Sequence, residues 1–323
     1  MLRIGLIGCG RHSETEHALP LKRYASKNPG EIVLAAACDL DQDRMQRFCH
    51  EFGFSRGYTD MNEMLATEKL DGCVCVMPVT KIAETGAVLL QRGIPCVLEK
   101  PPGTSREEVH RLADIASSSG TPHMVSVNRR FNPLLKRAVA WAREMGTMRY
   151  VSASMTRSMR TEEDFIWGTG IHAVDALRHI AGEVRDYEVR INRDGDKSPK
   201  WHEISFTFSS GCHGHLDILP TSGLGQEVYE LIGDEFTARV SMPFYMETSL
   251  RCWRQGKLVL EEGVPQDESP DVTSGAYGEV VEFVGALKQG VSPHPTIQDV
   301  LPSTDICFEI ASRVQDGIRK VES

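Results

Sequence analysis

The spacing of apolar residues divides the chain into two parts. As far as Val127, short and nearly continuous apolar runs alternate with segments of helical periodicity. Such runs are typical of parallel strands buried on both faces, and helices between them imply right-handed crossovers. We therefore predict a parallel sheet with strands at Leu2–Ile7, Ile32–Cys38, Gly57–Thr59, Asp71–Met77, Pro95–Leu98 and His123–Val127.

The pattern changes after Asn128. From Val184 onward, strand-like segments follow one another with few helices between them, which is typical of a mostly antiparallel sheet. The predicted strands are Met148–Thr156, Tyr187–Asn192, Glu203–Phe208, His213–Leu219, Glu227–Gly233, Thr237–Ser241 and Tyr245–Trp253. The predicted helices are Pro133–Met145, Ile171–Ile180, Glu279–Lys288 and Asp305–Arg319. We predict an α/β Rossmann domain over residues 1–125 and an α+β domain over residues 126–323.

Composition narrows the class of protein. The 323 residues are enough for two domains, and 36 basic against 45 acidic side chains give a net charge of −9. Because the chain has no basic block, nucleic acid is not expected as a partner. No apolar run is long enough to span a bilayer, and the initiating Met leads directly into the first strand. We predict a cytoplasmic protein without a membrane partner.

The nine cysteines are scattered, and several lie inside the predicted strands. This distribution predicts buried free thiols in a reducing compartment. Cys212, His213 and His215 form the one cluster that resembles metal ligands, but their alternation fits a strand, and no second pair lies at zinc-site spacing. We predict no metal site.

A short glycine-rich stretch follows the first strand. Gly8 allows a tight turn, and Gly10 lets the backbone approach a pyrophosphate at the start of the next helix. The third position of this dinucleotide-binding fingerprint is Ser13, which is still small. Alone, such a string is equally an ordinary glycine turn, so its context decides.

That context is an acidic residue at the end of the second strand. Asp39 lies at the spacing where a carboxylate accepts hydrogen bonds from the adenosine ribose. Leu40 after it offers nothing to a 2′-phosphate, which favours NAD, whereas Arg44 on the next helix leaves NADP open. The alternative for Asp39 is a solvated turn residue.

Lys100 follows Glu99 at the carboxyl end of the fifth strand, where ligands bind in open α/β sheets. A lysine there can hold a substrate hydroxyl and help its proton leave. The alternative is a surface lysine paired with Glu99.

Two later stretches carry further candidates. Asn128 precedes Arg129, whose guanidinium can orient a carboxylate or hydroxyl, although arginines at a domain junction more often form structural ion pairs. His172 and Asp175 are three residues apart at the start of a helix and share a face. Histidine is the usual proton acceptor at neutral pH, but in isolation a helical histidine is more often structural.

These motifs resemble those of the glucose-fructose oxidoreductase, inositol dehydrogenase and MocA (Gfo/Idh/MocA) family of nicotinamide-dependent oxidoreductases. The matching stretches, in family order and spacing, are Gly-Leu-Ile-Gly-Cys-Gly at 5–10, Cys-Asp-Leu-Asp at 38–41, Glu-Lys-Pro at 99–101, Asn-Arg-Arg-Phe-Asn-Pro at 128–133 and Gly-Ile-His-Ala-Val-Asp-Ala-Leu-Arg at 170–178. The resemblance covers essentially the whole chain and is thin in the later strands.

The resemblance implies a fold and a set of roles. It implies an N-terminal Rossmann domain and a C-terminal domain whose large open sheet forms homodimer or homotetramer contacts. The implied catalytic residues are Lys100, His172 and, in orienting His172 or its helix, Asp175. The residues assigned to the cofactor are Gly8, Gly10, Arg11, His12, Asp39, Met77, Pro78, Glu99, Lys100 and Asn128. Those assigned to the substrate are Arg129, Arg157, Arg160 and His172.

Two departures from the family pattern concern the substrate. The family usually has an aspartate four residues before the histidine, and this chain has Gly168 there. Glu163 or Asp164 in the preceding loop is the candidate replacement. The histidine that many members have after the fourth strand is replaced by Ile82. Arg157 and Arg160 could then recognise an acidic or phosphorylated sugar.

The sequence therefore predicts an NAD(P)-dependent oxidoreductase acting on a secondary hydroxyl or ketone of a sugar, polyol or sugar acid. Two alternatives stay open. One is a glycoside hydrolase that oxidises its substrate transiently and recycles NAD, and the other is a non-catalytic dinucleotide sensor. The sequence determines neither the identity of the substrate nor the physiological direction of the reaction.

Overall fold

A computed structural model describes residues 1–192, 201–244, 247–264 and 268–319. The chain divides into two compact units. Unit 1 comprises Met1–Phe131 and Ser269–Pro302, and unit 2 comprises Asn132–Glu268 and Ser303–Ser323. No helix among the described residues combines the length and apolarity needed to cross a membrane.

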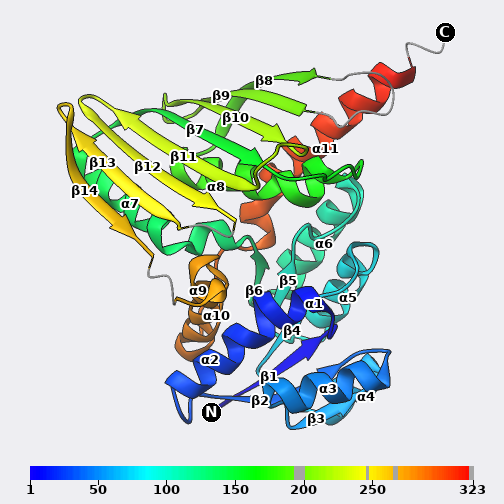
Figure 1. The fold of residues 1–323 in the computed structure, drawn as a ribbon. Helices are drawn as coiled ribbons and strands as arrows, with labels where there is room; N and C mark the ends of the chain where they lie inside the picture. The colour runs from blue at the N-terminus through cyan, green and yellow to red at the C-terminus, as the bar shows by residue number, and fades with distance from the viewer. Residues whose placement is uncertain (193–200, 245–246, 265–267, 320–323) are drawn as a thin grey trace. The chain divides into compact units, whose positions relative to one another are not determined.

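Unit 1 is built on a six-stranded parallel sheet with strand order β3-β2-β1-β4-β5-β6 (Figure 1). Its strands are β1 (Leu2–Ile7), β2 (Ile32–Cys38), β3 (Arg56–Tyr58), β4 (Gly72–Cys75), β5 (Cys96–Glu99) and β6 (His123–Ser126). Its helices are α1 (Arg11–Ser13), α2 (Leu19–Lys27), α3 (Gln42–Phe52), α4 (Met61–Thr67), α5 (Val79–Gln91), α6 (Arg106–Ser119), α9 (Pro270–Thr273) and α10 (Ala276–Gln289), with a 3₁₀ turn at Asn128–Phe131. This strand order is that of the dinucleotide-binding Rossmann fold, so the predicted parallel sheet is confirmed.

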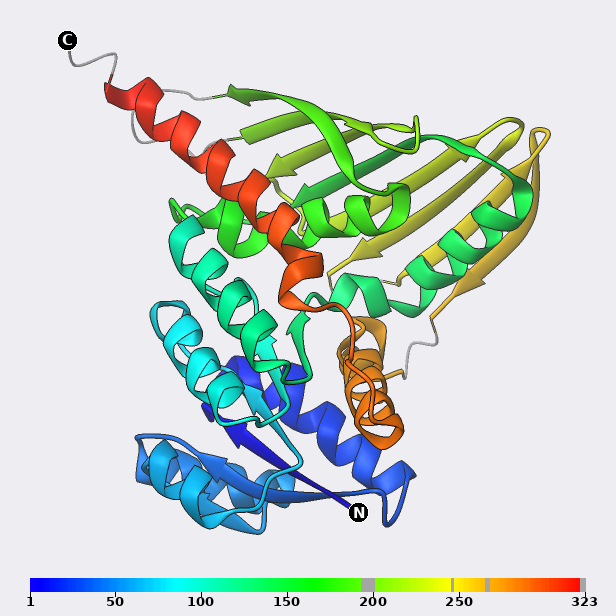
Figure 2. The same cartoon turned by 180° about the vertical axis from the view of Figure 1, so that it is seen from behind.

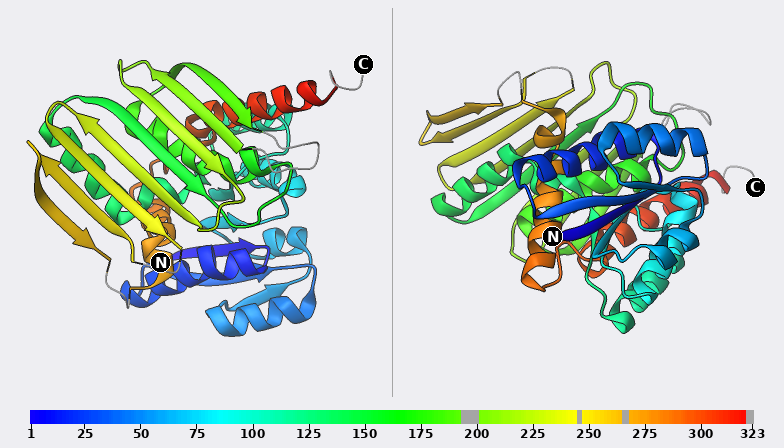
Figure 3. Two further views of the ribbon diagram at one scale, coloured as in Figure 1. Left: turned by 45° about the horizontal axis from the view of Figure 1, so that its top comes forward. Right: turned by 90° about the horizontal axis from the view of Figure 1, so that it is seen from below.

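Helix α10 packs on the Rossmann sheet although it follows the whole antiparallel sheet in sequence. Val280, Phe283 and Val284 share one buried core with Leu21 of α2 and with apolar residues of β1, β4, β5 and β6. The right-hand view of Figure 3 shows α10 beside α2. The predicted division at residue 125 therefore differs from the observed one, because residues 269–302 return to cover unit 1.

Unit 2 is an eight-stranded sheet with strand order β14-β13-β12-β11-β7-β10-β9-β8. Its strands are β7 (Met148–Thr156), β8 (Val184–Asn192), β9 (Trp201–Phe208), β10 (His213–Leu219), β11 (Gln226–Gly233), β12 (Phe236–Pro243), β13 (Ser249–Arg254) and β14 (Lys257–Gly263). All neighbours are antiparallel except β7 and β10. The predicted mostly antiparallel sheet is confirmed.

Helices cover one face of this sheet. Helices α7 (Pro133–Met145) and α8 (Ile171–Ala181) pack on it, as the view from behind in Figure 2 shows. The left-hand view of Figure 3 shows the opposite face of unit 2, over which no described helix of that unit lies. The last helix, α11 (Ile297–Arg319), begins in unit 1 and continues into unit 2.

The sequence missed three kinds of feature. Strand β14 and the short helix α9 were not predicted, and two π-helical turns, Glu14–Ala18 and Ile166–Gly170, lie where ordinary helix or loop was expected. Of the predicted strand Tyr245–Trp253, residues 245 and 246 lie outside the described residues, and β13 covers most of the remainder.

Candidate active site

The turn after β1 has the backbone geometry that a dinucleotide needs. Gly8 has a φ of +93°, and an added Cβ would lie 1.9 Å from the carbonyl oxygen of Val76, so only glycine fits there. Gly10, in contrast, faces open space, because an added Cβ would meet nothing within 4 Å. Gly10 also precedes α1 without a side chain that caps the helix. Backbone N–H groups at the start of a helix suit a pyrophosphate.

The carboxylate of Asp39 is fixed beside this turn. Its Oδ2 accepts a hydrogen bond from the Cys9 N–H at 2.8 Å, and its Oδ1 accepts one from the Asp41 N–H at 2.9 Å. The Arg44 guanidinium lies 3.4 Å from Oδ1 and 3.2 Å from Asp41. Leu40 is 89% exposed. Asp39 thus connects the ends of β1 and β2, and Arg44 is already paired with carboxylates.

A pocket of about 180 Å³ opens at the carboxyl ends of β4 and β5. Four predicted site residues, His12, Met77, Glu99 and Lys100, line it. The remaining lining residues are apolar: Val79, Ile82 and Pro101. Pro78, which is also a predicted site residue, lies directly before α5, between Met77 and Val79 of the pocket lining. The combination of apolar walls and a few convergent charges is typical of a ligand pocket.

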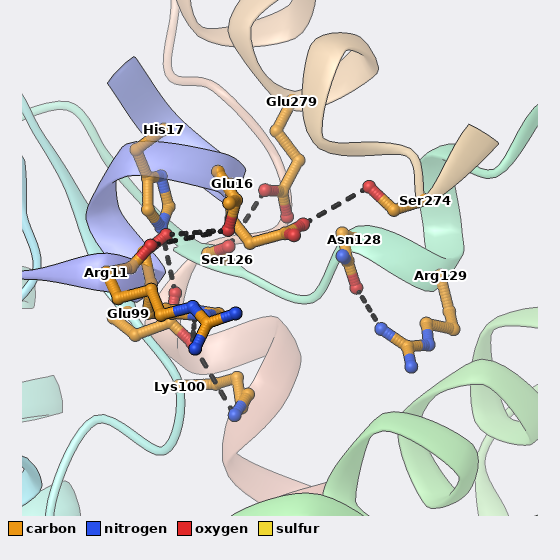
Figure 4. Close-up of polar contacts among 12 residues, drawn as sticks. Arg11, Glu16, His17, Glu99, Lys100, Ser126, Asn128, Arg129, Ser274 and Glu279 are labelled. Atoms are coloured by element: carbon orange, nitrogen blue, oxygen red, sulfur yellow. Dashed lines mark hydrogen bonds and ion pairs between the residues drawn. The ribbon is translucent and has the colours of Figure 1, made fainter. Parts of the chain in front are cut away.

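Glu99 is the centre of the polar contacts in this pocket. Its Oε2 lies 3.0 Å from Nε2 of His17, and its Oε1 lies 3.3 Å from Nε2 of His12 and 3.5 Å from Nζ of Lys100. Figure 4 shows Glu99 between His17 and Lys100. Burial acts to raise the pKa of Glu99, but the hydrogen bonds from the two histidines and the charge of Lys100 outweigh it and hold that pKa well below its usual range. An ionised carboxylate therefore lies beside Lys100.

Sequence reasoning missed His17. It lies five positions after His12, and in a regular α-helix residues at this spacing point about 140° apart. The π-helical turn Glu14–Ala18, which contains His17, changes the register, so that the two imidazole rings lie 5.9 Å apart and both reach Glu99. No pattern of apolar residues signals this turn in advance.

His12, His17 and Glu99 are also the group that satisfies metal-ligand spacing within the described part of the chain, with ligand atoms within 4.8 Å of one another. The Glu99 carboxylate already contacts both histidines, so its oxygens are engaged within the group. We therefore assign no metal here. Cys212 and His213 do not belong to such a group, and His215 contacts Asp217 at 3.0 Å.

A second buried carboxyl group lies in unit 1, and sequence reasoning missed it too. Glu279 of α10 is 4% exposed and accepts a hydrogen bond from the Ser126 hydroxyl at 2.8 Å. Its Oε1 has no hydrogen-bond partner among the residues that the structure describes. Burial raises the pKa of Glu279 well above its usual range, so its neutral form is favoured. Ser126 of β6 is the register partner of Glu99 of β5. Glu279 therefore lies near the carboxyl ends of these parallel strands, as Glu99 does (Figure 4).

The remaining predicted residues of unit 1 also lie near the carboxyl ends of the parallel strands. Arg11 begins α1 and is exposed. Asn128 is buried and accepts a hydrogen bond from the Arg129 guanidinium at 2.7 Å, in the turn directly after β6. The structure thus brings the predicted cofactor residues together around the carboxyl ends of the parallel strands.

In unit 2, His172 is the second residue of α8 and is 8% exposed. The π-helical turn Ile166–Gly170 ends immediately before this helix. Asp175 is 1% exposed and accepts a hydrogen bond from the Ser303 hydroxyl at 3.0 Å, and Ser303 accepts one from Arg178 at 2.7 Å. These contacts hold the middle of α8, one turn after His172, which suits the predicted positioning role of Asp175.

The turn before His172 contains the glycine that departs from the family pattern. The Oδ2 of Asp164 lies 3.5 Å from the position that a Cβ on Gly168 would occupy. The Gly168 N–H donates a hydrogen bond to the Asp164 carbonyl at 2.7 Å. Of the two candidate replacement acids, Asp164 is therefore the one whose carboxylate lies over this turn, whereas Glu163 is exposed.

The two arginines predicted to bind substrate have different surroundings. Arg157 is 5% exposed, forms a buried ion pair with Glu227 and lies over the Phe244 ring at 4.6 Å. Its contacts favour a structural role and do not support the predicted substrate contact. Arg160 is half-exposed, pairs with Glu162 and lies over the Phe165 ring at 5.4 Å.

Comparison with known proteins agrees with the geometry. Residues 2–128 match the model of the GFO_IDH_MocA oxidoreductase family, which has an NAD-binding Rossmann fold. The rhizopine catabolism protein MocA of Rhizobium meliloti is 26% identical over 335 residues, covering 99% of this chain and 97% of that protein.

Two further relatives act on sugars or polyols according to their names. The myo-inositol 2-dehydrogenase of Thermotoga maritima is 26% identical over 192 residues, covering 56% of this chain and 55% of that protein. A levoglucosan dehydrogenase, solved with NADH and levoglucosan, superposes with a TM-score of 0.81 at 16% identity and covers 97% of both chains. The second comparison is a likeness of fold.

Proposed function

We propose, on the premise that this chain belongs to the Gfo/Idh/MocA family of NAD(P)-dependent oxidoreductases, that it oxidises a secondary hydroxyl of a sugar, polyol or sugar acid, or reduces the corresponding ketone. The observation that carries this proposal is the placement of Lys100. It lines the pocket at the carboxyl end of β5 and lies 3.5 Å from an ionised, buried carboxylate.

The cofactor is NAD or NADP, and bound NAD⁺ supplies the acceptor for a hydride. The open space before Gly10 is where a pyrophosphate fits, and Asp39 offers its carboxylate near the same turn. We propose a preference for NAD, because a 2′-phosphate would meet the charge of Asp39. Arg44 is held by Asp39 and Asp41, which weakens the case for NADP.

Lys100 and His172 have separate roles in this proposal. Lys100, as a neutral amine, takes the proton of the substrate hydroxyl while the hydride leaves the carbon. His172 is a second acid–base group that holds the substrate oxygen, and Asp175, one turn further along α8, keeps the helix in place through Ser303. Neither role needs a metal ion.

The substrate class follows from the relatives' names and from the polar residues of unit 2. The relative from Thermotoga maritima is named for myo-inositol, and the structure of similar fold is named for levoglucosan. We propose that Asp164 supplies the carboxylate that binds substrate hydroxyls, because it lies over the turn where Gly168 leaves room. Arg160 would add affinity for an acidic or phosphorylated sugar.

We further propose that the enzyme works in the cytoplasm as a homodimer or homotetramer on small molecules. All nine cysteines are free, which supports a reducing compartment. The face of the unit 2 sheet that no described helix of that unit covers supports self-association.

The test is a substrate panel. Purified protein with NAD or NADP would be given inositols, aldoses, sugar acids, their phosphates and a chromogenic glycoside, with NADH absorbance and product analysis as readouts. Net NADH formation on a polyol or sugar supports the proposal. Glycoside cleavage without net NADH would identify the hydrolase, and silence on every compound with confirmed NAD binding would identify a sensor.

A further inference from the structure

One carboxylate oxygen in unit 1 has two cationic partners. Oε1 of Glu99 lies 3.3 Å from Nε2 of His12 and 3.5 Å from Nζ of Lys100. The other oxygen, Oε2, is bonded to His17. Since Glu99 contacts all three groups, a proton on one of them changes how strongly the carboxylate holds a proton on the next.

The groups around Glu99 differ in their access to solvent. The side chain of His17 is 4% exposed and that of Lys100 is 15% exposed, whereas that of His12 is 54% exposed. His12 also lines the same pocket as Lys100. His12 is therefore the member of the cluster that exchanges protons freely with solvent.

We propose that His12 is a positioning residue of the active site, and that its charge controls how readily Lys100 gives up its proton through their shared Glu99 oxygen. When His12 is protonated, it compensates part of the Glu99 charge and leaves Lys100 less firmly held as a cation. When His12 is neutral, the charge of Glu99 acts on Lys100 without this compensation. The inference rests on the proposed role of Lys100 as the group that takes the hydroxyl proton.

The charges that face His12 support this assignment. Glu99 raises the pKa of His12 through their hydrogen bond, burial and the charge of Lys100 lower it, and the charge of Glu16 in the π-helical turn adds a smaller upward contribution. The net direction is upward, so His12 carries its proton to higher pH than a free imidazole does. The repulsion between His12 and Lys100 is mutual, so a cation at position 12 must favour the neutral amine of Lys100.

The proton balance of the reaction explains why this matters. On oxidation, the O–H bond of the substrate breaks and its proton joins the neutral Nζ of Lys100, while the hydride leaves the carbon for NAD⁺. Lys100 must therefore be neutral at the start of each turnover and must release the acquired proton at the end. A cation at His12 favours both events.

The experiment measures the proton affinity of Lys100 directly. The full chain would be labelled with acetic anhydride over a range of pH, and the labelling of Lys100 followed by mass spectrometry, with exposed Lys81 as an internal reference. His12→Asn removes the cation, and His12→Arg makes it permanent. His50→Asn, at an exposed histidine on α3, is the control.

We expect the Lys100 labelling midpoint to rise in His12→Asn and to fall in His12→Arg, with the larger shift in His12→Arg, because arginine stays charged throughout the titration range of lysine. The Lys81 midpoint should stay constant, and His50→Asn should match the wild type. Opposite shifts separate a charge effect from a loss of structure, which would move both variants alike. Unchanged or parallel midpoints in the two His12 variants would overturn the inference.

The labelling readout does not depend on turnover. If the substrate panel shows no oxidation but the opposite shifts occur, the proposed function fails and the coupling of His12 to Lys100 holds. If a substrate is oxidised, the acid limb of kcat/KM should move in the same direction as the labelling midpoint in each variant.

Discussion

Two of the chain's Gly-x-Gly turns, Gly8–Gly10 in unit 1 and Gly168–Gly170 in unit 2, have glycines for different reasons. In the first, Gly8 needs a positive φ and a side chain would collide with a backbone oxygen, while Gly10 borders open space. In the second, neither Gly168 nor Gly170 has a positive φ. An added Cβ on Gly168 would lie 3.5 Å from the Asp164 carboxylate, and one on Gly170 would lie 3.0 Å from Ile218.

This difference separates the cofactor side from the substrate side. The first turn satisfies a backbone requirement that any bound dinucleotide imposes, so its form follows from the chemistry of the cofactor. The second turn leaves room for particular side chains, and these vary with the substrate. Mutations at the first turn should therefore affect folding or NAD binding, and mutations at the second should affect the choice and turnover of substrate.

The largest expected effect comes from Gly8→Ala. The collision with the Val76 oxygen and the positive φ should destabilise the fold by about 3 kcal/mol or more and abolish NAD binding. Gly10→Ala is the matched variant, since its Cβ has room: its stability should stay within about 0.5 kcal/mol of wild type while NAD affinity falls about tenfold. Thermal unfolding and NAD titration give both quantities. A stable Gly8→Ala variant would remove the distinction between the two turns.

The next largest effect should separate His172 from Asp175. His172→Ala should lower kcat by about 10² to 10⁴ and leave NAD affinity unchanged, because an acid–base group is lost. Asp175→Asn should mainly lower the melting temperature, because Asp175 contacts Ser303 in a buried network. Steady-state kinetics and thermal unfolding of both variants check this. Equal kcat losses with unchanged stability would instead make Asp175 part of the chemistry.

A smaller effect tests the second turn. Asp164→Ala should lower kcat/KM for the substrate found in the panel by about tenfold, through loss of one charged hydrogen bond. Gly168→Asp added to Asp164→Ala should restore most of the loss, because the backbone at 168 tolerates a side chain and the competing carboxylate is gone. Glu163→Gln, a substitution at the exposed acid next to Asp164, is the control. Failure of the double variant to recover would show that Asp164 does not serve the substrate.

The smallest effect concerns the buried acid Glu279. Its raised pKa means that the unfolded chain loses this proton first, above a pH of about 4.3, so stability falls as pH rises toward the folded-state pKa. Glu279→Gln removes this term, and its melting temperature relative to wild type should increase between pH 5 and pH 8. The exposed Glu84→Gln should show no such trend. A constant difference for Glu279→Gln would mean that Glu279 is ionised in the folded protein.

The sequence predicted the cofactor side in more detail than the substrate side. Both sheets were predicted, and Gly8, Gly10, Asp39 and Lys100 follow directly from local rules about strand ends and turns. Helix α10 was assigned to the wrong unit because its amphipathic pattern shows that it packs, but not on which sheet. The prediction followed chain order and placed α10 with the antiparallel sheet, which it follows in sequence. The buried Phe283 shows that α10 packs on the Rossmann sheet.

The substrate side depends on contacts that no local rule describes. The π-helical turn before His172 shifts the helical register without any change in hydropathy, as does the turn that contains His17 on the cofactor side. The buried pair of Arg157 and Glu227 joins residues 70 positions apart, so the sequence could not show that this arginine is already engaged. Asp164 was one of two candidate acids until the loop geometry distinguished it from Glu163.

The most direct test of the account is the turnover of Lys100→Met beside wild type, with Lys81→Met as an exposed control and NAD binding measured in all three. We predict that wild type and Lys81→Met form NADH on a polyol or sugar of the panel. Lys100→Met should bind NAD with similar affinity and form NADH at least about 10²-fold more slowly. Turnover of Lys100→Met at the wild-type rate would contradict the account.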